Sequence, residues 1–177
     1  MALREGIHLE PDPVWTERYE AERERVEAAS GDQLLGVFHV GSTAIPDLPG
    51  KPALDVLAVY ETEAAMRGAA ETLAEGAFEL TADEDGTILV IRWEQDSAVF
   101  VKMHLAGDEK ATNQLLFREY LREHPAARRE YEAVKREAAE QHPDDPQAYT
   151  QAKSGVVRSL LSAAREAGYD ERLPPFL

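Results

Sequence analysis

The chain has 177 residues, 44% of them hydrophobic, which suffices for one packed core and is short for two domains. It contains no cysteine, so disulfides, thiolate nucleophiles and cysteine-based zinc or iron–sulfur sites are excluded. Aspartate and glutamate outnumber lysine and arginine by 34 to 19, and the net charge of −15 repels nucleic acid. We therefore expect a single domain over residues 1–177 and no nucleic-acid partner.

The acidic excess is typical of a halophilic protein, because high salt confines repulsion between charges to a few ångströms. An acidic mesophilic protein is the alternative. On either interpretation most carboxylates serve solvation, so a functional carboxylate must be recognised by its position. No apolar run approaches the ~18–20 residues that cross a bilayer, and no charged-then-apolar leader opens the chain. We therefore expect a cytoplasmic protein with no membrane partner.

The first half of the chain predicts a helix, two strands around a loop, and a second helix. The opening helix is heavily charged on one face, which leaves Trp15, Tyr19 and Val26 to pack inward. Asp12 is suited to cap this helix. The expected elements are a helix over 13–30, strands over 34–40 and 52–60, and a helix over 63–75 capped by Thr62.

The middle of the chain is β-rich and the last third is helical. Turn-like acidic stretches separate the predicted strands. Strands joined by one crossover helix and followed by a helical tail indicate an α/β (α+β) fold, a sheet covered by helices. The expected elements are strands over 78–81, 87–93 and 98–105, then helices over 108–124, 125–141 and 146–167.

The loop between the first two strands, with its flanks, is the segment best suited to chemistry. It begins with Gly41, Ser42 and Thr43, it carries Lys51, and the strand that follows carries Asp55. Consecutive backbone N–H groups beside hydroxyls bind phosphate, and a lysine offers phosphate a point charge. The segment lacks the spacing of a P-loop. The alternative is an ordinary turn, with the aspartate paired to a nearby arginine.

This segment resembles the signature of the nucleotidyltransferase superfamily, in which a Gly-Ser turn precedes a strand carboxylate. Residues 39–46 and 51–56 more closely resemble the GrpB-like family. The resemblance implies a nucleotidyltransferase-like mixed sheet flanked by helices, with a helical last third, and the family also occurs fused to dephospho-CoA kinase. Further similar segments are 11–15, 103–105, 117–122, Tyr131 with Lys135, and Tyr149 with Lys153 and Ser154.

The carboxylates of the superfamily are only partly present. Nucleotidyl transfer uses metal ions held by several carboxylates, and the resemblance makes Asp55 the candidate catalytic residue. Leu57 stands where a second acid is expected, and His104 stands where a third is expected. Asp55, His104 and His39 are therefore candidate ligands of one divalent metal, with magnesium or manganese favoured over zinc. The alternative for His104 is a hydrogen-bonded residue at the end of the sheet.

Basic residues are candidates for binding an anion, since a cluster of them reverses the acidic field locally. The alternative for Arg92 and Lys102 is neutralisation of nearby acids. Lys135, by contrast, is expected to be structural. The candidate ligand-binding residues are Gly41, Ser42, Thr43, Lys51, Arg92, Lys102 and Lys153.

We expect the ligand to be a nucleotide or another phosphorylated small molecule. The leading hypothesis is a nucleotidyltransferase-like protein that uses Asp55 and one metal ion. The second is a binding module that keeps the phosphate site and has lost transfer chemistry, as Leu57 suggests. A role in protein interaction or folding assistance is the third, and only the fusions of the family suggest it.

Overall fold

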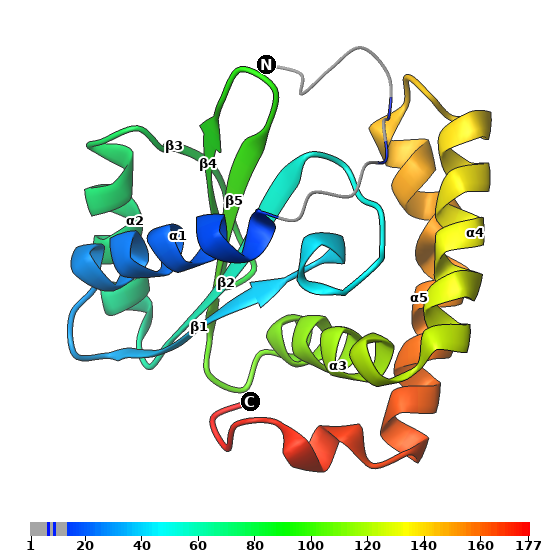
Figure 1. Cartoon of the computed structure of the whole chain (residues 1–177). Coiled ribbons are helices and arrows are strands. Elements are labelled where there is room, and N and C mark those ends of the chain that lie inside the picture. The colour runs from blue at the N-terminus through cyan, green and yellow to red at the C-terminus, as the bar shows by residue number, and fades with distance from the viewer. Residues whose placement is uncertain (1–6, 8, 10–13) are drawn as a thin grey trace.

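A five-stranded mixed sheet forms the centre of the computed structural model, which describes residues 7, 9 and 14–177 (Figure 1). The strands are β1 (Leu34–Val40), β2 (Ala53–Tyr60), β3 (Glu79–Glu84), β4 (Thr87–Trp93) and β5 (Ala98–Leu105), in the spatial order β1-β2-β5-β4-β3. β2 and β5 are parallel, and every other neighbouring pair is antiparallel. The predicted mixed sheet is confirmed.

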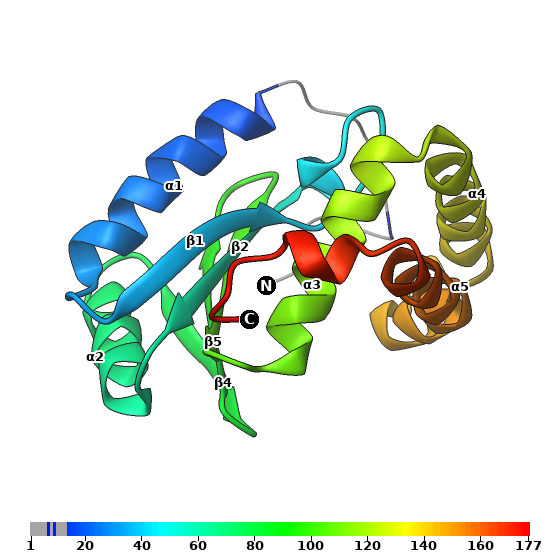
Figure 2. The ribbon, with the colours of Figure 1, turned by 90° about the horizontal axis from the view of Figure 1, so that it is seen from below.

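Helices cover both faces of this sheet (Figure 2). They are α1 (Trp15–Ala29), α2 (Glu63–Ala74), α3 (Glu109–Glu123), α4 (Pro125–Gln141) and α5 (Pro146–Glu166), with short 3₁₀ helices η1 (Ser42–Ala44) and η2 (Tyr169–Arg172). α1 and α2 pack on one face and α3 packs on the other, while α4 and α5 lie side by side beyond α3. None of the described helices is long and apolar enough to cross a membrane.

β2 is apolar on both faces because both are covered. Alternate side chains of a strand point to opposite faces. Val56 and its alternate neighbours pack with α1 and α2, whereas Leu57 and Val59 pack with Ala111 and Leu115 of α3. Asp55 therefore lies on the α3 face of the sheet, in line with Leu57.

The helix caps follow the sequence, and one strand is longer than predicted. Thr62 Oγ1 accepts from the Ala65 N–H at 3.3 Å, which caps α2 as expected. β3 runs to Glu84, because the acidic stretch predicted as a turn pairs with β4 and leaves Asp85 and Gly86 to form the turn. The predicted cap at Asp12 lies outside the described residues.

A buried ion pair joins α1 to the sheet. Glu22 belongs to the heavily charged helix α1, yet the residue is only 4% exposed. Arg92 of β4 donates to its carboxylate at 2.9 Å and lies over the Phe78 ring at 5.1 Å. Arg92 lies on the face of α1 and α2 and is the buried partner of this carboxylate, whereas its second partner, Arg25 at 3.3 Å, is exposed.

We predict that Arg92→Met lowers the free energy of unfolding by about 2–4 kcal/mol, because the Glu22 carboxylate loses its buried partner. Urea denaturation measures this change. The double variant Glu22→Leu/Arg92→Met is the control, and it should be more stable than the single variant because no buried charge remains. Equal stability of wild type and Arg92→Met would contradict this account.

Candidate functional site

A cavity of about 430 Å³ lies between the α3 face of the sheet, the β1–β2 loop, α4 and α5. Four of the five lysines of the chain line it, namely Lys51, Lys102, Lys135 and Lys153. Among the described residues that line the cavity, Asp55 is the one carboxylate. In a chain with a net charge of −15, this cluster is a local reversal of the electrostatic field.

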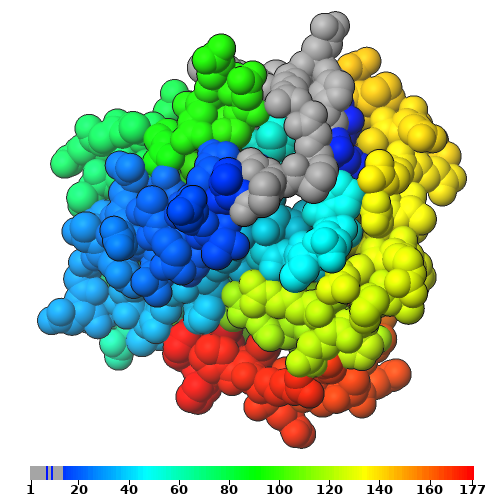
Figure 3. All heavy atoms as spheres, in the orientation of Figure 1, coloured from blue at the N-terminus to red at the C-terminus, as the bar shows by residue number. Residues whose placement is uncertain are grey.

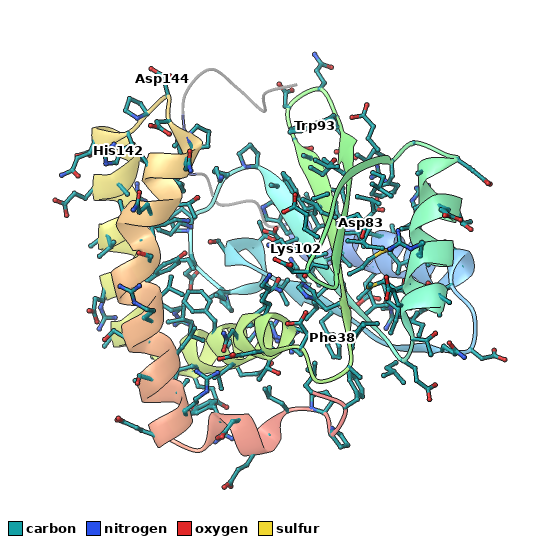
Figure 4. All side chains as sticks on the ribbon, turned by 180° about the vertical axis from the view of Figure 1, so that it is seen from behind. Phe38, Asp83, Trp93, Lys102, His142 and Asp144 are labelled. Atoms are coloured by element: carbon teal, nitrogen blue, oxygen red, sulfur yellow. The ribbon has the colours of Figure 1, made fainter. Side chains whose placement is uncertain are left out.

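The pairing of β2 with β5 brings Asp55 and Lys102 together. Leu57, two residues beyond Asp55, pairs with Lys102 in the parallel register, so both polar side chains lie on one face. Lys102 Nζ lies 3.0 Å from Asp55 Oδ1. Figure 4 labels Lys102 near the middle of the molecule. The alternative considered for Asp55, an ion pair with an arginine, is met in part, because Asp55 pairs with a lysine.

Two glycines let the β1–β2 loop fold closely over the cavity, and Figure 3 shows part of this loop between α1 and the helices of the last third. Gly41 has φ 75°, and a Cβ atom there would overlap the Asp55 carboxylate. A Cβ atom at Gly50 would lie 2.8 Å from the Ser42 Cβ. The loop thus needs glycine for backbone conformation at one position and for space at both.

Lys135 is the most deeply buried charged group of the cavity. Its side chain projects from α4, and the residue is 2% exposed. Nζ donates to Ser42 Oγ and to the Pro49 carbonyl oxygen, each at 2.6 Å. Burial, and then the charges of Lys153 and Lys51, lower the pKa of Lys135 to about 7. No carboxylate of the described residues forms an ion pair with it, and the charges of Asp55 and Glu132 oppose the lowering of its pKa only in part.

Lys153 and Lys51 share an aromatic neighbour. Their Nζ atoms lie 4.2 and 5.3 Å from the centre of the Tyr149 ring, in cation–π contact. Burial, and then the charge of Lys51, lower the pKa of Lys153 to about 8. Burial also lowers the pKa of Lys51. Two half-buried lysines from the loop and α5 thus hold positive charge beside one ring.

The structure brings together most of the predicted ligand-binding residues and excludes one. Arg92 lies on the opposite face of the sheet, bound to Glu22 and Glu94, so its assignment to the ligand site is wrong. For Arg92 the alternative, neutralisation of nearby acids, is the correct one. The predicted residues that do line the cavity are Gly41, Ser42, Thr43, Lys51, Asp55, Lys102 and Lys153.

The predicted metal ligands do not meet. Asp55 pairs with Phe100 and His104 pairs with Val59, so about 13 Å of strand separates Asp55 from His104. His104 Nδ1 lies 2.9 Å from Asp108 Oδ2, which confirms the alternative of a hydrogen-bonded residue at the end of the sheet. The prediction that Asp55 and His104 bind one metal ion together is therefore wrong.

His39 fails as a metal ligand for a different reason. It pairs with Val56, which places it on the α1 face of the sheet, opposite to Asp55. Its Nε2 bonds Thr43 Oγ1 at 2.8 Å, and its ring stacks on Tyr19. Burial, and then Arg122, lower its pKa to about 4. Among the described residues, no three His, Asp or Glu side chains are grouped as a metal site requires.

The sequence analysis assigned no ligand-binding role to Lys135, Tyr131 or Tyr149. Lys135 has the structural role that was expected, since it binds Ser42 and the loop, and it also lines the cavity. Tyr131 and Tyr149 line the same space. Composition offers one signal for Lys135. The chain has 14 arginines and only five lysines, so a lysine at a given position suggests a specific role.

Comparisons with known structures give the class of the fold. The crystal structure of conserved protein GrpB from Enterococcus faecalis superposes with a TM-score of 0.82 and 23% identity, over 92% of this chain and 99% of that one. The Cid1 poly(U) polymerase, solved with magnesium and 3'-dATP, superposes with a TM-score of 0.57 and 8% identity, over 81% of this chain and 49% of that one. The fold is therefore nucleotidyltransferase-like.

Sequence comparison identifies the family. The family described as GrpB protein matches residues 7–163. The UPF0157 protein YqkA of Bacillus subtilis (strain 168) is 30% identical over 155 residues, which are 85% of this chain. The chain spans 45% of the length of that relative. The chain belongs to the GrpB family, and the expected resemblance is confirmed.

We predict that Lys135 makes the stability of the free protein depend on pH. Its pKa is about 7 in the folded chain and near 10.5 when unfolded, so the unfolded chain binds the extra proton between these values. The free energy of unfolding should therefore rise with pH from 7 toward 10, by at most about 1.4 kcal/mol per pH unit from this group.

Denaturation of wild type, Lys135→Met and Lys110→Met at several pH values tests this prediction. In Lys135→Met the free energy of unfolding should rise less steeply with pH than in wild type. In Lys110→Met it should rise as in wild type, because Lys110 is exposed and outside the cavity. Parallel pH profiles for wild type and Lys135→Met would contradict it.

Proposed function

We propose that the lysine-lined cavity binds the phosphate of a nucleotide or another phosphorylated small molecule. The observation that carries this proposal is the convergence of four lysines from four separate elements around one carboxylate. Lysines repel one another, and burial removes the water that solvates them. An anionic ligand supplies the compensating charge that the described residues of the cavity do not provide.

Ser42 and Lys135 support a phosphate position at the floor of the cavity. The Lys135 ammonium group has three hydrogen-bond donors, and two of them are directed to Ser42 Oγ and the Pro49 carbonyl oxygen. The third is available to a ligand oxygen, and the Ser42 hydroxyl can donate to the same ligand. Lys153 of α5 and Lys51 of the loop add charge to the same cavity beside the Tyr149 ring, so one phosphate group can contact donors from α4, α5 and the loop.

Aromatic side chains support a nucleotide as the ligand. Phe100, Phe117, Tyr131 and Tyr149 line the same cavity as the lysines. Aromatic walls beside a few polar groups are typical of small-molecule sites, and a base can stack on such rings. The likeness of the fold to the Cid1 structure, which contains 3'-dATP, favours the same interpretation.

Between an enzyme and a binding module, Leu57 favours the binding module. Asp55 remains the candidate catalytic carboxylate, and it is the residue that would hold a divalent metal. Leu57, however, is fully buried and packs with Val40 and Leu115, so the position of the second acid belongs to the core. We therefore propose ligand binding as the activity of this cavity, with nucleotidyl transfer as the second candidate.

We predict that pyrophosphate and ATP bind this cavity and that lysine substitutions weaken the binding. Lys153→Ala should raise the Kd at least tenfold, because a half-buried cation that contacts the ligand is lost. Isothermal titration calorimetry measures the Kd. Lys110→Ala is the matched control and should bind like wild type. Equal Kd values for wild type and Lys153→Ala, or no binding of either compound, would refute the proposed function.

We also predict that binding takes up protons near pH 8. In the protein without ligand, the pKa of Lys135 is about 7 and that of Lys153 is about 8, so both side chains are partly neutral at pH 8. A bound phosphate favours the charged forms, so the affinity should fall as the pH rises from 6 to 9. Calorimetry in two buffers of different ionisation enthalpy measures the uptake, and identical heats in the two buffers would contradict it.

A further inference from the structure

The donor set of the cavity does not fit the metal ions that the fold implies. A two-metal site needs several carboxylates around ions about 3.5–4 Å apart. Here Asp55 has no second carboxylate beside it among the described residues, Leu57 occupies the next position on the same face, and His39 and His104 lie elsewhere. Magnesium in such sites is held by one or two carboxylates together with substrate phosphates and waters, and the single carboxylate here is already paired with Lys102.

The position beside Asp55 is already taken by a cation that the chain supplies. Lys102 Nζ lies 3.0 Å from Asp55 Oδ1, and the Gly41 backbone packs against Oδ2. The two side chains are 35% and 23% exposed, so solvent screens their attraction only in part. They project from adjacent parallel strands on one face of the sheet, and their ion pair keeps the ammonium group beside the carboxylate.

The remaining lysines disfavour a further positive charge in the same cavity. The pKa of Lys51 responds to Asp55 and to Lys102, and the pKa of Lys153 responds to Lys51, Asp55 and Lys102. These groups therefore interact electrostatically across the cavity. A divalent ion at Asp55 would be repelled by each of them, whereas a ligand with several negative charges would be attracted.

We propose that Lys102 takes the place of the metal, so that the cavity binds a di- or triphosphate free of divalent cations. This inference rests on the proposed function and names the form of its ligand. Four ammonium groups against one carboxylate leave an excess of three positive charges when all the lysines are protonated. Metal-free pyrophosphate or a nucleoside triphosphate matches this excess, while a magnesium complex carries less negative charge.

Titration of wild type with pyrophosphate and with ATP, in EDTA and then in excess Mg²⁺, tests this proposal directly. Binding in EDTA is expected, with an affinity that Mg²⁺ lowers because it competes for the ligand. Binding at least tenfold tighter with Mg²⁺ would overturn the metal-free site and leave the proposed function intact. No binding under either condition would refute the proposed function itself.

Two variants separate the role of Lys102 from that of Asp55. Lys102→Met should weaken binding in EDTA at least tenfold, and Lys110→Met should not change it. Asp55→Asn removes a negative charge and releases Lys102, so binding in EDTA should stay equal or become tighter. A metal-dependent site would instead lose binding in Asp55→Asn, and that result would overturn the proposal. Circular dichroism establishes that each variant is folded before titration.

Discussion

The parallel pairing of β2 with β5 is the constraint on which both the core and the site depend. It joins strands that are far apart in the chain and makes β2 internal, with one face under α1 and α2 and the other toward α3. The same register that packs Leu57 against α3 pairs Leu57 with Lys102, and this places the Lys102 ammonium group 3.0 Å from the Asp55 carboxylate. Packing and electrostatics at this position are therefore consequences of one strand pairing.

The lysine cluster opposes the stability of the free fold. Lys135 is 2% exposed, and the burial that lowers its pKa is a cost that the folded chain must offset elsewhere. The apolar clusters on both sides of β2 and the Glu22–Arg92 pair supply stabilising contacts outside the cavity. Such a separation between a strained polar site and a well-packed scaffold is typical of ligand-binding sites.

The chain has the fold of its class together with a cavity lined by four lysines and one carboxylate. The Gly-Ser turn and Asp55 resemble the superfamily, and the superposition with the Cid1 structure supports the fold. In this chain, however, Leu57 packs in the core and Lys102 forms an ion pair with Asp55. Fold similarity alone therefore does not determine the activity, which depends on these side chains.

The sequence by itself determined the elements, the mixed sheet flanked by helices and the importance of the β1–β2 loop. Local signals sufficed to predict the helices and strands, because hydrophobic periodicity and helix caps such as Thr62 depend on only a few neighbouring residues. Only the tertiary structure decided which side chains share a face. Val40, not His39, pairs with Asp55, so His39 lies on the opposite face of the sheet. The packing of α4 and α5 brings Lys135 and Lys153 to the loop. Such contacts depend on register and helix packing, which one sequence does not specify through local patterns.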